Sequence, residues 1–542
     1  MAERKRIYLC LAHMSEAGME QKYIKEAFET NWVVPLGPNV NGFEKDLEDF
    51  VTQKAQKSQK EKSLADNAEN AEMGAPRGAG NGHTDGTDDT DKLSLADSAA
   101  LELCSLATEG TQEYAERLAS KRVVALSAGT AAVHLALIAC GVGPGDEVIV
   151  QSFTFCASSH PITYLGATPV FVDSEKETWN MDPELLEVAI KDRKAKTGRY
   201  PKAIVPVALY GMPYQIERIM EIADRYGIPV IEDAAEGFGS RYKGQVLGTF
   251  GKYGVLSFNG NKMITTSGGG ALITPDEESW REIMMYATQY RESYPYYQHE
   301  KIGYNYRMSN ICAGIGRGQM TIVDAHIEHH KHVQKMYEEL LADVPGVHVH
   351  SQPEGHTEST EITESGAPRG AGKGHTDGTD DTDKLSLADN AALELCSLAT
   401  EGTQEYADNA EIVPVYDSNY WLCTITLDPE VKVKGQENAY KTIVTGAVGG
   451  AAGVIHAAES ATTDCQPNDN VEAMRVALDK AQIEARPVWK PMHKQPVYAS
   501  APAYVNGVSE AIFKVGMCLP AGPYVTDEDV KYIVETIKSA IL

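Results

Sequence analysis

The chain has 542 residues, of which 42% are hydrophobic, and this length and composition predict a large core in about two to four domains. Its formal net charge of −28 argues against a nucleic-acid partner, because phosphate backbones select basic surfaces. No apolar run approaches the roughly 20 residues that a membrane helix needs, and the nine cysteines include no C-x-x-C pair. We therefore expect a cytoplasmic protein with no membrane span, disulfide framework or metal site.

The first predicted element is a strand at 7–12, an apolar run too short for a secretion signal. An N-terminal helix is expected from about Ser15 to Thr30. Residues 1–54 would then form the N-terminal segment of the folded body.

A duplicated acidic stretch follows. Residues 74–115 recur as 366–407, and only 2 of the 42 aligned positions differ between the copies. The two copies supply −11 of the net charge of −28, because one carries eight acids and two bases and the other eight acids and three bases. Unrelated sequence separates them, so they cannot stack as a solenoid. The Gly/Asp/Thr-rich half of each copy lacks the apolar residues needed to fold, and it does not match a calcium loop.

The positions of these copies predict insertions into an otherwise continuous fold. The first insertion would span 55–116, the second 353–412, and a third about 434–470. Long insertions in surface loops add little loop-closure entropy, so the core could still form around them. The residues do not reveal what the insertions do or where they came from.

A strand, a turn and a helix come next. Val123–Leu126 reads as a strand and Thr130–Cys140 as an apolar helix. Backbone N–H groups at the start of the helix, together with the hydroxyls of Ser127 and Thr130, would make an anion site. An ordinary strand–turn–helix unit is the alternative.

The next chemical signal is acidic. Asp233 and Glu236 follow the short apolar run Ile228–Glu232, which places them at the carboxyl end of a predicted strand. Ligands bind at that end in open α/β sheets. A carboxylate there could bond a protonated pyridine nitrogen, although an Asp at a strand end is often a helix cap.

Lys262 lies five residues after Ser257 and shortly before the glycine run 268–270. An aldehyde cofactor with a phosphate tail requires these residue types. The amine bonds the aldehyde, the hydroxyl holds the phosphate, and the glycines let the backbone approach the ring. A solvated lysine in a turn is the alternative.

The same region shows an alternating pattern of strands and helices, which predicts an α/β sandwich with a mostly parallel sheet. A charged helix at Asp324–Leu341 then leads into a smaller α+β unit, whose last helix begins after a cap-like Thr526. The predicted strands lie near Val123, Val148, Val170, Ile204, Val230, Val255 and Ala271.

In this order, the phosphate turn, the acidic strand end and the lysine resemble the DegT/DnrJ/EryC1/StrS family of sugar-nucleotide aminotransferases. The resemblance implies the fold-type I scaffold of enzymes that use pyridoxal 5'-phosphate, with a large domain at 117–322 and a small C-terminal domain at 323–542. The large domain would have a mostly parallel mixed sheet sandwiched by helices. Further segments similar to the family are 32–38, 143–149, 166–173, 303–309 and 486–493.

The resemblance also implies roles for the polar residues around the cofactor. Lys262 would bond the cofactor aldehyde and shuttle protons. Asp233 would pair with the pyridine nitrogen, and Glu236 would lie near the 3-hydroxyl group. The phosphate would be held by Gly129, Thr130 and Ser257.

Four further roles are implied in the same way. Phe155 would stack on the cofactor ring, although it could simply be a buried strand aromatic. Asn305 would reach the cofactor phosphate of a neighbouring subunit, which implies a homodimer with shared active sites. Tyr306 and His493 would contact the substrate.

The implied activity moves an amino group from L-glutamate to the 4-keto carbon of a nucleotide-linked 4-keto-6-deoxy sugar, for cell-surface glycan biosynthesis. The chain is most similar to the bacillosamine-pathway branch, which acts on UDP-linked N-acetylhexosamines. Relatives that dehydrate sugars carry histidine in place of this lysine, so Lys262 favours transamination. Two alternatives stay open: a GDP-perosamine synthase-like transaminase, and a non-catalytic interaction protein on the same scaffold.

Overall fold

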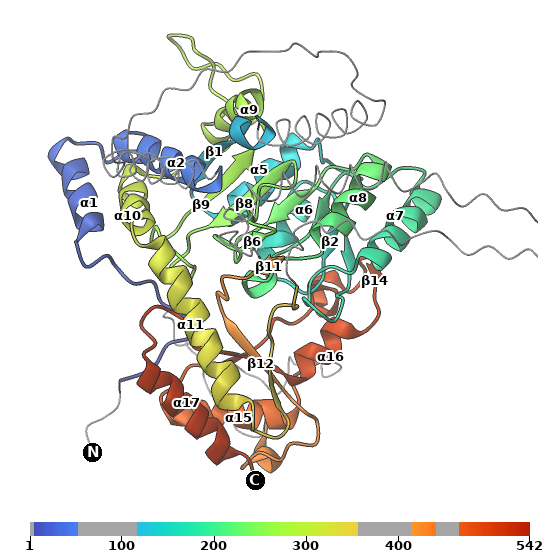
Figure 1. The fold of residues 1–542 in the computed structure, drawn as a ribbon. Helices are drawn as coiled ribbons and strands as arrows, with labels where there is room; N and C mark the ends of the chain where they lie inside the picture. The colour runs from blue at the N-terminus through green and yellow to red at the C-terminus, as the bar shows by residue number, and fades with distance from the viewer. Residues whose placement is uncertain (1–4, 53–115, 356–413, 441–464) are drawn as a thin grey trace, which may run out of the picture.

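The computed structural model describes residues 5–52, 116–355, 414–440 and 465–542 (Figure 1). The three predicted insertions and both copies of the acidic repeat lie outside the described residues, apart from the edges of the insertions. The insertions, and the domain boundaries drawn around them, stay predictions.

A mixed, mostly parallel sheet forms the centre of the larger part. Isolated bridges join β4 to β5 and link two four-stranded sheets into the order β14-β3-β2-β4-β5-β8-β9-β1. Only β9 runs against its neighbours, β8 and β1. The strands are β1 Arg122–Leu126, β2 Glu147–Gln151, β3 Thr168–Val172, β4 Ile204–Val205, β5 Ile231–Asp233, β8 Tyr253–Ser257, β9 Gly270–Thr274 and β14 Ala503–Tyr504.

Helices cover both faces of this sheet (Figure 1), which explains why its strands are almost continuously apolar. In β1, alternate residues enter different cores: Val123 packs with one set of helices and Val124 with the other. One face carries α2 Pro38–Val51, α7 Pro183–Thr197, α8 Ile216–Tyr226 and α10 Asn310–Met320; the other carries α5 Gly129–Ala139, α6 His160–Tyr164 and α9 Glu277–Ala287.

A second hydrophobic core lies toward the C-terminus. The antiparallel sheet β10-β12-β15-β13 packs there with α11, α15 and α17. Thr526 caps α17 in a capping box with Asp529, as its position before the helix predicts. The elements of this part are α11 Val323–Leu341, β10 Val347–Val349, β12 Cys423–Leu427, α15 Asp469–Lys480, β13 Arg486–Pro487, α16 Val508–Val515, β15 Gly516–Leu519 and α17 Asp527–Ala540. A small sheet of β11 Tyr416–Asp417, β6 Arg241–Tyr242 and β7 Gln245–Val246 lies against the larger part.

The predicted N-terminal strand at 7–12 is wrong. Only Ile7 forms a β-bridge, with Ile483, because the chain then bonds a different segment every few residues and builds no ladder. The predicted helix is present as α1 Met19–Glu29, which packs against α10 and starts after a left-handed Gly18.

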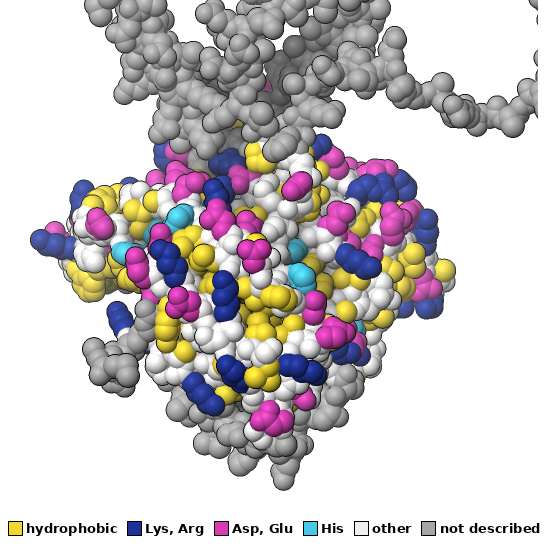
Figure 2. All heavy atoms as spheres, turned by 60° about the horizontal axis from the view of Figure 1, so that its bottom comes forward, with side chains coloured by type: hydrophobic (Ala, Val, Ile, Leu, Met, Phe, Trp, Pro, Cys, Tyr) yellow, Lys and Arg dark blue, Asp and Glu magenta, His cyan; other side chains and the backbone are white. Residues whose placement is uncertain are grey.

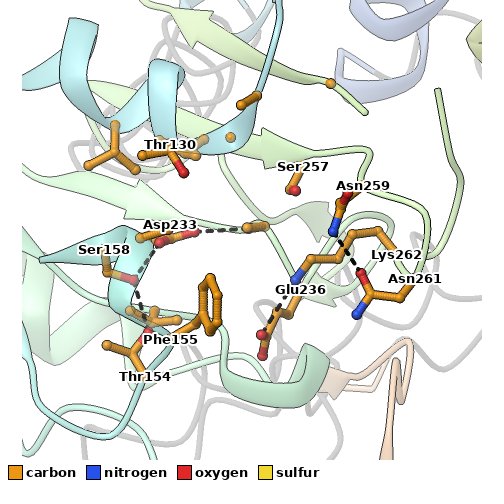
Figure 3. A pocket seen from close by; sticks show the side chains of 18 of the residues that line it. Thr130, Thr154, Phe155, Ser158, Asp233, Glu236, Ser257, Asn259, Asn261 and Lys262 are labelled. Carbon is orange, nitrogen blue, oxygen red and sulfur yellow. Dashed lines mark hydrogen bonds and ion pairs between the residues drawn. The ribbon is translucent and has the colours of Figure 1, made fainter. Parts of the chain in front are cut away.

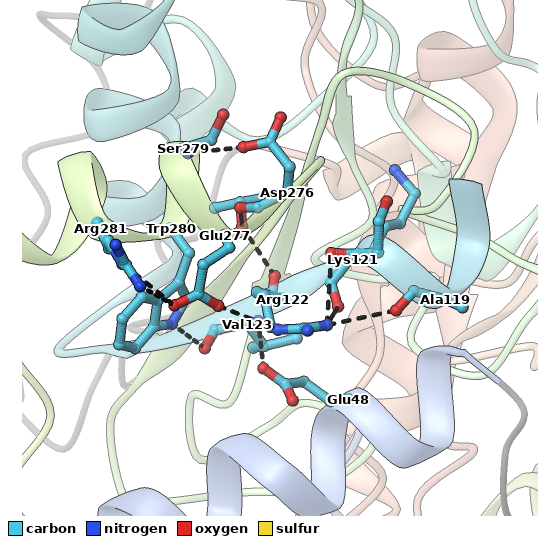
Figure 4. Close-up of polar contacts among 12 residues, drawn as sticks. Glu48, Ala119, Lys121, Arg122, Val123, Asp276, Glu277, Ser279, Trp280 and Arg281 are labelled. Carbon is cyan, nitrogen blue, oxygen red and sulfur yellow. Dashed lines mark hydrogen bonds and ion pairs between the residues drawn. The ribbon is translucent and has the colours of Figure 1, made fainter. Parts of the chain in front are cut away.

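Hydrogen bonds join the described residues on either side of the first and second predicted insertions. Glu48 of α2 accepts a hydrogen bond from the Val123 backbone N–H at 3.1 Å, and Trp280 of α9 donates to the Val123 carbonyl at 3.1 Å (Figure 4). At the second site, the Val415 N–H donates to the Gly355 carbonyl at 3.1 Å. The interpretation of the intervening segments as insertions stays a prediction.

Charged side chains of both signs are interspersed over the described part of the face in Figure 2. Many form exposed ion pairs, such as Arg218 with Glu184, which contribute little stability individually. Among the described helices, none is both long and apolar enough to cross a membrane.

Candidate active site

A cavity of about 330 Å³ opens at the carboxyl ends of β1, β5 and β8, which run parallel. This edge is where open α/β sheets bind ligands. Seven of the ten predicted site residues line it (Figure 3): Gly129, Thr130, Phe155, Asp233, Glu236, Ser257 and Lys262.

One side of the cavity suits an anion. Helix α5 begins here at Gly129, and no side chain caps its N-terminus. Ser257 lies so close that a Cβ at Gly129 would be 3.0 Å from the Ser257 Cβ. Glycine therefore lets the positive end of the helix and a hydroxyl meet the same ligand group.

Asp233 is buried at the end of β5 and bonded on both carboxylate oxygens. Its Oδ2 accepts from the Ser158 hydroxyl at 2.7 Å, and its Oδ1 accepts from the Ala235 N–H at 3.1 Å. Because Ser158 donates to the carboxylate, the Thr154 hydroxyl, 2.9 Å away, must donate to Ser158. Burial raises the pKa of Asp233, and the two donors and the charge of Lys262 oppose that rise.

Lys262 enters the cavity from the loop after β8, and its side chain is 13% exposed. Its Nζ lies 3.4 Å from Glu236 Oε1 and 4.0 Å from the ring centroid of Trp421. Burial raises the pKa of Glu236, whereas the charge of Lys262 and the Tyr210 N–H, which donates to Oε2 at 2.8 Å, lower it.

Phe155 follows β2 and is 50% exposed, which is unusual for an aromatic side chain in the wall of a cavity. Its ring contacts that of Trp489 at a centroid distance of 5.3 Å. The free ring surface is available to stack on a planar ligand.

Three predicted site residues do not line the cavity within the single chain. Asn305 forms a backbone bridge with Thr288. The Tyr306 hydroxyl lies 3.2 Å from His134 Nδ1, and His493 Nδ1 lies 2.6 Å from the Ser152 hydroxyl. Their contacts with a substrate or a second subunit stay predictions.

Sequence reasoning missed several cavity residues. Ser158 had a usable signal, because Thr154 and Ser158 flank Phe155 in a segment already assigned to the site. Trp489 lies in the family-like segment 486–493 but was not singled out, and Trp421 was missed because a buried and a cavity-lining tryptophan look alike in sequence. Asn259 and Asn261, beside Lys262, were not singled out either.

The residues of the cavity fit pyridoxal phosphate. A lysine, a buried carboxylate and an uncapped helix N-terminus match its aldehyde, its pyridine nitrogen and its phosphate. The described residues contain no group of three or more His, Cys, Asp or Glu side chains placed to hold a metal ion.

Comparison with known proteins supports the same chemistry. The DegT/DnrJ/EryC1/StrS aminotransferase family matches residues 98–365 and 441–538. EpsN of Bacillus subtilis, described as a pyridoxal phosphate-dependent aminotransferase, is 33% identical over 537 residues, which cover 98% of this chain and 95% of EpsN. GDP-perosamine synthase of Escherichia coli O157:H7 is 42% identical over 245 residues, 45% of this chain and 65% of that enzyme. A DegT/DnrJ/EryC1/StrS aminotransferase from Brucella abortus superposes with a TM-score of 0.62 at 21% identity, covering 96% of this chain and 95% of its own, and shows the same fold.

Proposed function

Because the chain belongs to the DegT/DnrJ/EryC1/StrS aminotransferase family, we propose a specific reaction for this pyridoxal phosphate-dependent sugar-nucleotide aminotransferase. It moves an amino group from L-glutamate to the 4-keto carbon of a nucleotide-linked 4-keto-6-deoxy sugar, for cell-surface glycan biosynthesis in the cytoplasm. The observation that carries the proposal is the meeting of Lys262, Asp233 and the start of α5 around one cavity.

The side chains divide the chemistry among them. Bound pyridoxal phosphate supplies an electron sink for negative charge on carbon. Asp233, which accepts hydrogen bonds from the Ser158 hydroxyl and the Ala235 N–H, would hold a proton on the ring nitrogen of the cofactor. Lys262 Nζ would carry a proton between the reacting carbon of the substrate and the aldehyde carbon of the cofactor in each half-reaction. Phe155, in the wall of the cavity, would stack on the cofactor ring and exclude water from it.

The nucleotide would bind in a groove of about 530 Å³ next to the cavity. The groove shares Thr154, Phe155 and Trp489 with the cavity and adds Lys490 and Gln495. Within the described residues, no carboxylate is within ion-pair distance of Lys490, so its ammonium group could pair with a diphosphate. The aromatic walls would face the sugar or the base.

We propose UDP-linked N-acetylhexosamine as the sugar nucleotide, from the resemblance to the bacillosamine-pathway branch. A GDP-linked sugar is the second candidate, and the 42% identity to a GDP-perosamine synthase over 245 residues favours it. A non-catalytic role is disfavoured, because seven of the ten predicted site residues surround one cavity.

The test is to incubate the protein with L-glutamate and a panel of UDP- and GDP-linked 4-keto-6-deoxy sugars, with a UDP-linked 3-keto sugar included. Release of 2-oxoglutarate and the mass of the aminosugar are scored. We expect turnover with a 4-keto substrate and none in the Lys262→Ala variant. If only the 3-keto sugar were aminated, the enzyme would act at C3 and not at C4. Undiminished turnover in the Lys262→Ala variant would refute the catalytic role of Lys262.

We also propose a homodimer in which Asn305 acts on the neighbouring subunit's cofactor. The loop before Asn305 supports this, because Tyr296, Tyr297 and Ile302 are among the most exposed apolar side chains described. The Lys262→Ala and Asn305→Ala variants are each expected to be inactive. Mixed after dissociation, they should regain activity, since one of the two sites then has both native residues. Failure to regain activity would place Asn305 in the site of its own subunit.

A further inference from the structure

The amine of Lys262 lies close to two groups, the carboxylate of Glu236 and the ring of Trp421, and the sequence did not predict that they share this neighbour. Glu236 Oε1 is 3.4 Å from Nζ, and the centroid of the Trp421 ring is 4.0 Å from it. Figure 3 shows the lysine side chain extended toward Glu236. A carboxylate and the face of an indole both attract a cation.

The Trp421 ring is held firmly in this position. The residue is 1% exposed, and its indole N–H donates to the Asn261 carbonyl at 2.6 Å. Its backbone N–H donates to Asn419 Oδ1 at 2.9 Å, and the Asn419 amide donates at 3.0 Å to the Glu236 carbonyl. Asn419 therefore links the backbone of Trp421 to the backbone of Glu236.

Two histidines of helix α11 bond the backbone next to Lys262 and next to Trp421. His326 Nδ1 lies 3.2 Å from the Met263 carbonyl, and His330 Nδ1 lies 3.1 Å from the Tyr420 carbonyl. A carbonyl only accepts, so both rings donate from Nδ1. Burial lowers the pKa of both histidines, that of His330 to about 3, and keeps them neutral donors. The neighbours of Lys262 and Trp421 in sequence are thus anchored one helical turn apart.

We propose that Trp421 is a positioning residue that holds the charged amine of Lys262 beside Glu236 whenever the lysine is not bonded to the cofactor. The inference rests on the proposed transamination, in which the lysine must leave the cofactor and return to the same place. Among the described residues, Asp233 and Cys10 are the other titratable groups that interact with the charge of Lys262. Burial raises the pKa of the Cys10 thiol to about 12, so the thiol stays neutral and supplies no negative charge to attract the amine in place of the Trp421 ring.

The test measures how readily Lys262 is acylated in the full-length protein freed of cofactor. Only the neutral amine reacts, so peptide mass spectrometry after trace labelling reports how much of the amine is neutral. Rates are compared at neutral pH and at about pH 11, above the ordinary lysine value of about 10.4. A change in access alters both rates equally, whereas loss of a cation site raises the rate at neutral pH more than the rate at about pH 11.

We expect Trp421→Leu to raise the ratio of the labelling rate at neutral pH to the rate at about pH 11 roughly tenfold, which is the usual strength of a buried cation–π contact. Trp421→Phe keeps a weaker ring and should raise the ratio less. Trp489→Leu opens the same cavity away from the amine and should leave the ratio unchanged.

An unchanged ratio in Trp421→Leu, or an equal rise in Trp489→Leu, overturns the proposal. If Trp421→Leu does not fold, Trp421→Phe decides, with a rise of about threefold expected and no rise overturning the proposal. The labelling needs no substrate, so a wrong assignment of the reaction would leave its outcome unchanged. Conversely, an active transaminase with an unchanged ratio would keep its function and lose this role for Trp421.

Discussion

Replacement of Ser158 by alanine tests how far its hydroxyl group lowers the pKa of the buried Asp233. The Ser158 hydroxyl donates to Asp233 Oδ2 at 2.7 Å, and burial already raises the pKa of Asp233. Without this donor, the pKa of Asp233 rises further, because the charged form loses a hydrogen bond while the neutral form loses less. A hydrogen bond to a charged group contributes about 1.5–3 kcal/mol, so pyridoxal phosphate should bind roughly ten- to a hundredfold more weakly.

The pH profile gives a second measurement of the same effect. Asp233 must be ionised to hold the proton on the cofactor ring, and it protonates as the pH falls through its pKa. A higher pKa therefore moves the acid limb of kcat/KM to higher pH in the Ser158→Ala variant. Cofactor affinity is measured by absorbance titration, and kcat/KM at saturating cofactor across the acid range.

Thr154→Val is the matched control. Thr154 bonds Ser158 at 2.9 Å, whereas the described side-chain and backbone donors to Asp233 are Ser158 and Ala235. This variant should move cofactor affinity and the acid limb in the same direction, but by less. If Ser158→Ala left both unchanged, or if the control had the larger effect, the assigned chain of donors from Thr154 to Asp233 would be refuted.

Three further outcomes are expected. Glu44→Ala should lower the free energy of unfolding by about 3 kcal/mol or more in urea titrations, because it leaves Arg307, 9% exposed, without its bidentate partner. A smaller loss would mean that water replaces the carboxylate. Gly129→Ala should weaken cofactor binding about tenfold by crowding the phosphate site, whereas Gly143→Ala, with nothing within 4 Å of the added methyl, should not. Equal affinities would contradict the close approach at α5. His330→Leu should cost about 1–3 kcal/mol by urea unfolding, because a buried carbonyl loses its donor, and no loss would argue against that bond.

Seven of the eight strands of the central sheet could be predicted because they are buried in nearly unbroken apolar runs, whereas the partly exposed edge strand β14 was not predicted. Val148 in β2 and Val255 in β8 lie in nearly unbroken apolar runs, and the structure places strands at both. The apolar run at 7–12 has the same composition but makes no ladder, since its partners are three separate segments. Local composition reports burial, and only the fold decides which backbone groups pair.

The site was predictable where its residues mark the ends of strands and helices. Gly129, Asp233 and Ser257 lie at such ends, which the parallel sheet brings to one edge. Trp421 lies in the part of the chain with its own core, and packing alone brings it to Lys262. No spacing in the sequence records that contact.

The hydrogen bond between Gly355 and Val415 also has a practical use. Two positions in the chain that are joined by a hydrogen bond can serve as an attachment point for a foreign domain whose own termini are close together. A fluorescent reporter grafted between these residues would join the catalytic body at a site away from the lysine cavity. The same junction could also be sealed by a short glycine linker, giving a shorter enzyme for crystallisation.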